Sequence, residues 1–357
     1  MTIRSSARPV ILFAASALFL AGCAAAPDEG TGTDDTANTD YCARMVTNSG
    51  GLEDRSFNQS SWEGLERAAD EYGIEVDAIV SQTETDLAPN VQQAVETGCQ
   101  FVLTVGFELT DATSEAAGQN PDIHFAIVDE FVDGENIKPI VFDTAQAAFL
   151  AGYLAAGVSQ TGIVGTFGGG NQPPVTLFMD GYVDGVAHYN DVHGTAVAVI
   201  GWDKATQNGA FTGDFENTSL GKTTTEGMLD QGADVILPVA GQVGEGAAAA
   251  ILERGNASLI WVDNDGYETL PEDFRPIVLT SILKNTQDAV VEIVGKDIEG
   301  DFSNEPFIGT LENGGVDIAP FHDRAPLVSA ELAAEIDQLR ADIIDGTITV
   351  TSPATPK

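Results

Sequence analysis

Runs of apolar residues alternate with amphipathic segments along the chain from residue 42 onward. A short apolar run bounded by turn residues predicts a buried strand, and apolar residues at helical spacing predict a helix. In this first series, strands are expected over 43–47, 74–80, 101–105, 124–128 and 137–142, and helices over 56–72, 87–97 and 109–119. Alternation with such short connections predicts a parallel sheet covered by helices.

The same alternation starts again after residue 146. Helices are expected over 147–158, 175–189, 220–229 and 246–254, and strands over 162–167, 195–200, 234–239 and 259–262. Because open sheets rarely exceed about ten strands, the two series predict two doubly wound lobes. The tail adds strands at 277–282 and 307–311 and helices at 289–298 and 330–344, which are too few for a third domain.

The predicted architecture is therefore an α/β fold of two doubly wound parallel-sheet lobes, joined by a hinge that the chain crosses several times. The first lobe is expected over 41–142 with part of 275–310, and the second over 143–274 with 311–350. Ligands of open parallel sheets bind beyond the carboxyl ends of the strands. A binding cleft between the lobes is the expected site.

The N-terminus carries a targeting signal. Arg4 and Arg8 precede an apolar run over 10–20 that is too short to span a bilayer, so we expect residues 1–22 to be a signal peptide. The letters LAGC, which end in Cys23, resemble the bacterial lipobox, in which the cysteine is lipidated; an ordinary secretory peptide cut elsewhere is the alternative. Lipid on Cys23 would anchor the protein to the extracytoplasmic face of the cell membrane.

Residues 23–40 follow as a tether. They contain five acidic residues and no large apolar side chain, so we expect them to be disordered. The chain of 357 residues has a net charge of -40, and loss of the two arginines with the signal makes it -42. Such a charge repels nucleic acid and favours solubility at high ionic strength.

The chain has three cysteines. Besides Cys23, Cys42 and Cys99 each stand just before a predicted strand, and in a sheet of order 2-1-3 those two strands are neighbours. In an exported protein a disulfide between them is expected, with two buried thiols as the alternative.

Polar and aromatic side chains follow several predicted strands, where they would face the cleft. They are Asn48, Gly50, Gly51, Asp54, Ser56, Phe57 and Asn58 after the first strand, residues 106–108 after the third, Asp129 after the fourth, and residues 168–170, 240–241, Asp263, Asp265 and Lys284 in the second lobe. Carboxylates, amides, one lysine and aromatic rings together can sandwich a flat ring and hydrogen-bond a sugar.

Simpler roles compete for some of these residues. For Ser56 an N-cap and for Asp54 a turn are favoured over a ligand role, and Phe57 can equally staple its helix to the core. Asp129 and Asp263 directly follow apolar strands, where an acid costs free energy unless it has partners. We therefore favour a functional role for these two aspartates.

An enzyme is the rival class. The sequence has no G-x-S-x-G, H-E-x-x-H or Walker A pattern, and its four histidines lack metal-ligand spacing. We expect no catalytic activity, no bound metal and no cofactor.

Several separated segments resemble one bacterial family. VTNSGGLEDRSFNQSSWEGL, FAIVD, FLAGYLAA, DQGADVILPVAG and VLTSILKN are similar to the basic membrane lipoprotein (PnrA-like) family of substrate-binding proteins, from about residue 44 to the tail. The resemblance implies the type I periplasmic-binding fold. It also implies a protein that binds purine nucleosides and delivers them to the permease and ATPase of an ABC transporter; we expect a monomer.

The resemblance also implies roles for single residues. It makes Phe57 one aromatic plate against the base, with Asn58 beside it, and Asp129 the acid at the base edge. Phe211 or Phe215 would be the second plate, and Phe215 is preferred because it stands closer to the start of the next helix.

Four more candidates complete the implied site. Gly241 would bring its backbone against the ligand, and Asp263 and Lys284 would hold the ribose hydroxyls. Asn48 stands where the family commonly has Asp, so the identity of the base stays open. Closure of both lobes on the ligand is the expected mechanism. Alternatives are a same-fold binding protein for a sugar or other small polar ligand, and a ligand-sensing lipoprotein without a transporter.

Overall fold

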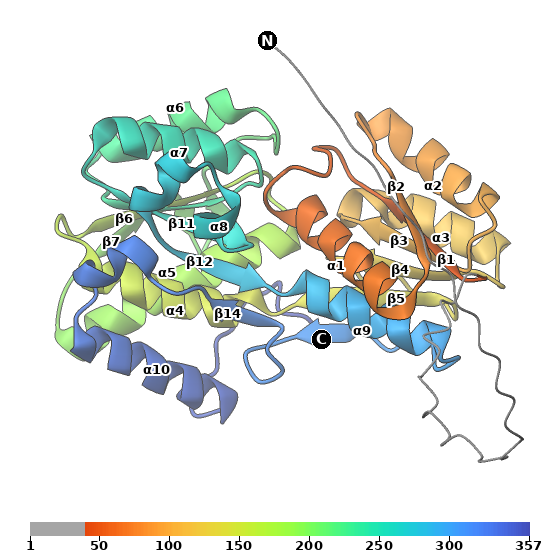
Figure 1. Cartoon of the computed structure of the whole chain (residues 1–357). Coiled ribbons are helices and arrows are strands. Elements are labelled where there is room, and N and C mark those ends of the chain that lie inside the picture. The colour runs from red at the N-terminus through yellow and green to blue at the C-terminus, as the bar shows by residue number, and fades with distance from the viewer. Residues whose placement is uncertain (1–39) are drawn as a thin grey trace, which may run out of the picture. The chain divides into compact units, whose positions relative to one another are not determined.

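The computed structural model describes residues 40–357, which fold into two α/β lobes (Figure 1). The expected signal peptide 1–22, Cys23 and the expected tether up to residue 39 lie outside the described residues. Within 40–357, no helix combines the length and the apolar character that crossing a membrane requires.

A parallel sheet of six strands forms the centre of the first lobe. In spatial order the strands are β13 (Phe307–Gly309), β5 (Ile137–Phe142), β4 (His124–Val128), β3 (Phe101–Val105), β1 (Cys42–Val46) and β2 (Glu75–Ile79). The predicted order of the first three strands, 2-1-3, is confirmed. Every residue of β3 is buried, as expected for a central strand with helices on both faces.

The second lobe repeats this arrangement. Its six strands, in spatial order, are β14 (Val316–Ile318), β12 (Val278–Lys284), β11 (Ser258–Asp263), β10 (Val235–Val239), β6 (Ile163–Gly168) and β7 (Ala198–Ile200). All neighbours are parallel except β12 and β14. A separate two-stranded ribbon consists of β8 (Trp202–Asp203) and β9 (Asn208–Gly209).

Helices connect and cover the strands, as the alternating pattern predicts. They are α1 (Phe57–Tyr72), α2 (Leu87–Glu96), α3 (Thr110–Gln119), α4 (Thr144–Val158), α5 (Pro173–His193), α6 (Thr218–Asp230), α7 (Val243–Arg254), α8 (Gly266–Thr269), α9 (Thr286–Ile298) and α10 (Ala330–Ile344). Four short 3-10 helices are η1 (Glu84–Asp86), η2 (Phe107–Leu109), η3 (Glu272–Ile277) and η4 (His322–Leu327).

The chain passes between the lobes three times, after β5, after β12 and after β13. These crossings lie side by side, because the backbone N–H of Asp143 donates to the carbonyl of Gly309 at 2.8 Å and that of Asn285 to Gly315 at 2.9 Å. The second crossing carries α9 back to the first lobe, where it packs on α1. The three crossings form a hinge along one side of the cleft.

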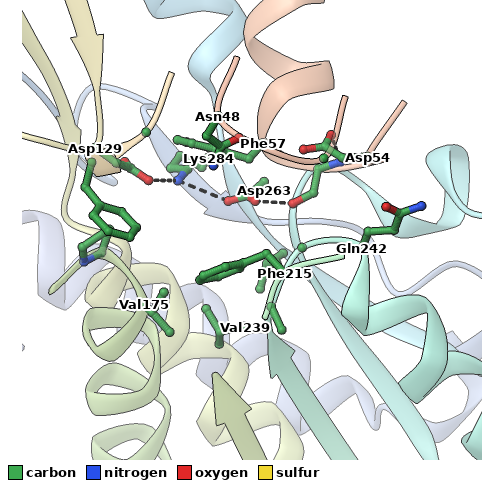
Figure 2. A pocket seen from close by; sticks show the side chains of 18 of the residues that line it. Asn48, Asp54, Phe57, Asp129, Val175, Phe215, Val239, Gln242, Asp263 and Lys284 are labelled. Carbon is green, nitrogen blue, oxygen red and sulfur yellow. Dashed lines mark hydrogen bonds and ion pairs between the residues drawn. The ribbon is translucent and has the colours of Figure 1, made fainter. Parts of the chain in front are cut away.

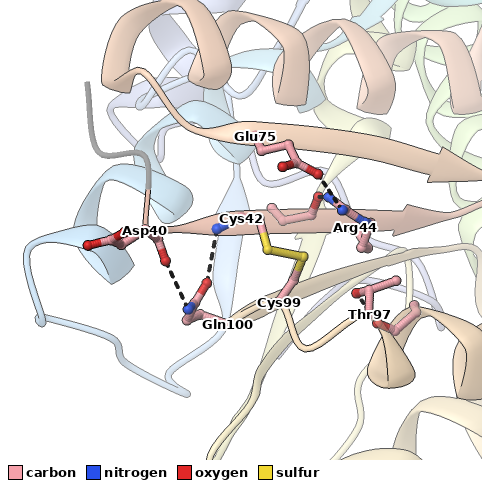
Figure 3. The surroundings of a disulfide bond; sticks show 9 residues. Asp40, Cys42, Arg44, Glu75, Thr97, Cys99 and Gln100 are labelled. Atoms are coloured by element: carbon pink, nitrogen blue, oxygen red, sulfur yellow. Dashed lines mark hydrogen bonds and ion pairs between the residues drawn. A yellow bond between two sulfur atoms is a disulfide. The ribbon is translucent and has the colours of Figure 1, made fainter.

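A disulfide joins Cys42 to Cys99 at the amino ends of β1 and β3 (Figure 3). The two strands are neighbours in the sheet, which brings the Cα atoms to 4.9 Å. The side chain of Gln100 accepts from the N–H of Cys42 at 2.9 Å and donates to the carbonyl of Asp40 at 3.1 Å. This end of the sheet is therefore held by both covalent and polar contacts.

Candidate binding cleft

A cavity lies between the carboxyl ends of the two sheets (Figure 2). Eight of the nine residues predicted to bind a ligand line it, namely Asn48, Asp54, Phe57, Asp129, Phe215, Gly241, Asp263 and Lys284. The parallel topology brings them together, because it places the residues that follow the strands along one edge of each sheet.

Two phenyl rings lie on opposite sides of the cavity. Phe57, the first residue of α1, comes from the first lobe, and Phe215 comes from the segment before α6 in the second (Figure 2). The Phe215 ring rests on the backbone of Gly169, where an ideal Cβ would lie only 2.3 Å from the ring. Phe211 instead packs edge-on against Trp202, with ring centres 5.8 Å apart, and is not a lining residue.

Lys284, at the end of β12, ties the two lobes together. Its Nζ atom lies 2.6 Å from a carboxylate oxygen of Asp129 in the first lobe and 3.3 Å from one of Asp263 in the second. All three side chains are at least nine-tenths buried. Burial opposes the charge on Lys284, but the two carboxylates outweigh it and raise the pKa of its amine. The same Nζ lies 4.5 Å from the centre of the Phe57 ring, within range of a cation–π contact.

Both aspartates have an unusual backbone conformation. Asp129 follows β4 and Asp263 ends β11, and each has a φ of 67°. This left-handed conformation is uncommon for residues other than glycine, although aspartate tolerates it better than most. It turns the chain sharply at the strand end, so each carboxylate lies at the cavity (Figure 2).

The loop before α1 is held by Asp54. Its carboxylate accepts the backbone N–H groups of Ser56 at 3.1 Å, Asn58 at 2.8 Å and Gln59 at 3.0 Å. Burial raises the pKa of Asp54 to about 6 in spite of these three donors, and the charge of Asp263 adds to the rise. The Asp54 carboxylate therefore stabilises the first turn of α1.

The expectation that the Ser56 side chain caps α1 is wrong. Ser56 stands at the N-cap position, but its side chain makes no capping hydrogen bond. Because Asp54 already accepts the free N–H groups of the first turn, the Ser56 hydroxyl is available to donate to Asp263 across the cleft.

A network of amides lies behind the first-lobe edge of the cavity. The Nδ2 of Asn58 donates to Oδ1 of Asn48 at 2.8 Å and to the carbonyl of Ser49 at 3.3 Å. Asn58 is the one predicted binding residue that does not line the cavity. In this structure it fixes the orientation of Asn48, which does.

Gly241 lines the second-lobe side of the cavity, next to Phe215. It has a φ of 53°, and an ideal Cβ there would lie 3.5 Å from the carbonyl of Phe215. A larger residue would therefore be strained by its backbone conformation rather than by crowding. Because Gly241 has no side chain, its backbone can lie against a ligand, and the following Gln242 also lines the cavity.

Part of the cavity wall was not predicted from the sequence. Pro174, Val175 and Phe178, in the first turns of α5, line the cavity. The sequence signal for them is the pair of prolines that follows the glycines at 168–170 after two intervening residues, because proline favours the first turn of a helix. Their apolar character makes them look like ordinary core residues.

Contacts between the lobes outside the cavity were also not predicted. The side chain of Arg55, which has a φ of 60°, donates to Glu245 at 3.1 Å and to the carbonyl of Thr269 at 2.8 Å. The indole N–H of Trp261 donates to the Arg55 carbonyl at 3.3 Å, and Asn264 donates to that of Ser56 at 3.0 Å. The loop before α1 is therefore hydrogen-bonded to the second lobe, and we call the Arg55 contacts a latch.

Metal ligands are not grouped in the described part of the chain. Across residues 40–357, no three histidine, cysteine, aspartate or glutamate side chains are arranged to hold an ion. Asp129 and Asp263 instead pair with Lys284, and Asp54 pairs with backbone N–H groups.

Residues 43–353 match a family model described as "ABC transporter substrate-binding protein PnrA-like". The ABC transporter nucleoside-binding protein BmpA of Lactococcus lactis subsp. cremoris is 32% identical over 356 residues, covering 95% of this chain and 96% of that protein. Basic membrane protein A of Borreliella burgdorferi is 28% identical, with coverages of 85% and 86%. An ABC transporter solute-binding protein of Aeropyrum pernix K1, solved by crystallography, superimposes with a TM-score of 0.77 and 26% identity, over 88% of this chain and 94% of that one.

Proposed function

Because the chain belongs to the PnrA-like family of ABC transporter substrate-binding proteins, we propose that it binds a purine nucleoside between its lobes. The general role follows from the family: such proteins act on the extracytoplasmic side of a membrane and pass a ligand to a permease driven by an ATPase. The identity of the ligand as a purine nucleoside does not follow from family membership alone, and the chemistry of the cavity supports it.

The observation that carries the proposal is the pair of rings, Phe57 and Phe215, on opposite sides of the cavity. A purine base between them would stack on both faces. Stacking of a base on an aromatic side chain contributes about 1–3 kcal/mol per ring, by analogy with nucleic-acid binders. Since each ring comes from a different lobe, both contacts form only when the cleft is closed.

The sugar has suitable partners among the charged groups. An ammonium has three N–H donors, and the two carboxylates beside Lys284 take two of them, which leaves one for a ribose hydroxyl. Asp263 would accept from a second hydroxyl, the backbone of Gly241 would lie against the ligand, and Asp129 would bond the base edge. An analogue without these groups would leave buried charges unpaired, which gives specificity.

The charge of the cavity disfavours anionic ligands. Of the lining residues, all in the described part of the chain, four are carboxylic acids, namely Asp54, Glu108, Asp129 and Asp263, and one is a cation, Lys284. A phosphate or a free carboxylate would meet a net negative field. A neutral nucleoside fits this field better than a nucleotide or an amino acid.

Closure would couple binding to transport. A ligand that touches both lobes binds the closed state better and so shifts the hinge equilibrium toward it. The permease would then recognise the closed form. We also propose that lipid on Cys23 anchors the protein to the membrane, that it acts as a monomer, and that it performs no chemical step on its ligand.

Calorimetry with the purified protein tests the proposal. Guanosine, inosine and adenosine are compared with cytidine, ribose and glucose, and we expect saturable one-to-one binding of at least one purine nucleoside. Recovery of the nucleoside without free base after incubation would agree with the absence of catalysis. Binding of ribose or glucose with no response to any purine nucleoside would contradict the proposal and favour a sugar-binding protein.

A further inference from the structure

The first-lobe edge of the cavity contains a carboxylate that lacks a full set of donors. Glu108 lies in η2, directly after β3, and lines the cavity together with Asn48. Its Oε2 atom is buried and has no hydrogen-bond partner within residues 40–357. A buried acceptor without a donor is rare in folded proteins because its lost hydration is not replaced.

The aspartates of the cavity already have partners within the protein. Asp129 and Asp263 flank Lys284, and Asp54 accepts three backbone N–H groups. For Glu108, burial raises the pKa of the carboxyl group, while its own backbone N–H and the Asn48 side chain oppose the rise. The carboxylate of Glu108 therefore has acceptor capacity left for a ligand.

Glu108 also marks one end of the cavity. A second hollow continues between the lobes and shares Ser49, Phe107, Glu108 and Phe215 with the first. None of Asp129, Asp263 and Lys284 borders this second hollow. A ring stacked on Phe215 can therefore present one edge to Glu108.

We propose that Glu108 selects guanosine among the purine nucleosides by accepting two hydrogen bonds from the guanine edge. The inference rests on the proposed function. Guanine presents N1–H and its 2-amino group side by side, and the two oxygens of a carboxylate accept two such parallel donors.

The other purines offer this carboxylate less. Hypoxanthine, the base of inosine, has the N1–H but no 2-amino group. Adenine presents the N1 acceptor beside its 6-amino donor, so a lone pair would face a carboxylate oxygen. The expected order of affinity is guanosine, then inosine, then adenosine.

Calorimetry on the wild-type chain tests this order without a mutation. Guanosine, inosine, adenosine and 1-methylguanosine are titrated, and guanosine should bind about tenfold or more tighter than each of the others, since a hydrogen bond to a charged group is lost. If inosine or adenosine binds as tightly as guanosine, the inference is wrong while nucleoside binding stands. If no purine nucleoside binds, both the inference and the proposed function fail.

A matched pair of variants assigns the effect to one residue. Glu108→Gln keeps the shape and replaces one acceptor by a donor, so guanosine affinity should fall about tenfold or more and that of inosine should change little. Glu84→Gln removes the same charge from an exposed residue that borders only the second hollow. It should keep the guanosine preference. An unchanged ratio in Glu108→Gln, or an equal loss in Glu84→Gln, would overturn the assignment.

Discussion

Asp129 and Asp263 occupy equivalent places in the two lobes and share one ammonium group. Each stands at the end of the third strand in the spatial order of its sheet, and each has a φ of 67°. Lys284 comes from the strand next to Asp263, so its 2.6 Å contact with Asp129 crosses the cleft. A buried ion pair therefore holds the two lobes together in this structure.

Loss of the shared cation should destabilise the fold. Lys284→Met leaves two buried carboxylates without their partner, which we expect to lower the free energy of unfolding by about 3–5 kcal/mol. Urea denaturation measures the change. Lys296→Met is the control, because Lys296 is half exposed and, within residues 40–357, its ion pair is with Glu292 on its own helix. Equal stability of both variants would show that the buried contact is not coupled to folding.

The two rings across the cavity should each contribute to binding. We expect Phe57→Ala and Phe215→Ala to weaken nucleoside binding by about 1–3 kcal/mol each, which is about 5- to 150-fold. Calorimetry measures the affinities. Phe131→Ala is the control, since Phe131 is 42% exposed and does not line the cavity. A comparable loss in the control would mean that the rings act through stability rather than by stacking.

The buried carboxyl of Asp54 makes stability depend on pH. Burial raises its pKa from an ordinary value of 3.8 to about 6, so between these values the folded state holds more protons than the unfolded state. Stability must then fall as pH rises through this window. A shift of about two units corresponds to about 3 kcal/mol. Relative to Asp54→Asn, the wild-type free energy of unfolding should decrease by that amount from about pH 4 to pH 7.

Denaturation at several pH values checks this, and the difference between wild type and variant cancels the other acids. Asp203→Asn is a control of opposite sign, because hydrogen bonds from Thr206 lower the pKa of the exposed Asp203. A wild-type stability that rises relative to Asp54→Asn over the same window would contradict the prediction.

The latch formed by Arg55 should act on closure and not on ligand choice. Arg55 contacts Glu245 and Thr269 but does not line the cavity. A partly exposed ion pair contributes about 0.2–1 kcal/mol. Arg55→Ala should therefore lower the affinity for every nucleoside by the same factor, about 2- to 5-fold. Small-angle scattering should show a larger ligand-free protein. Arg67→Ala removes an exposed pair between α1 and α9 and should change neither quantity; a selective loss for one nucleoside would contradict the latch.

The sequence predicts strongly periodic elements well and short ones poorly. The helix at 330–344 and the strand at 137–142 are found with the expected bounds. The strand expected over 195–200 begins only at Ala198, because Thr195 and Val197 are bonded to Asn190 at the end of the preceding helix. β14 was not predicted, since three residues with a central aspartate carry no period, and only pairing with β12 makes them a strand.

The candidate site follows the same division. Asp129, Asp263 and Lys284 are predictable because parallel strands fix where their carboxyl ends lie. The ion pair between Lys284 and Asp129 is not predictable from the sequence, because it joins segments 155 positions apart across the cleft. The open carboxylate oxygen of Glu108 is likewise a property of its surroundings and has no signature in the letters around it.

The hinge has a consequence for how the chain reaches its native state during synthesis. The edge strand β13 and the covering helix α9 of the first lobe are encoded after the last parallel strand of the second lobe. The first lobe is therefore incomplete when residues 41–142 have been synthesised, and its sheet is complete only when the chain has grown past Gly309. The order of translation and export thus makes the two lobes mature together, and a product that ends prematurely lacks both a finished lobe and a working hinge.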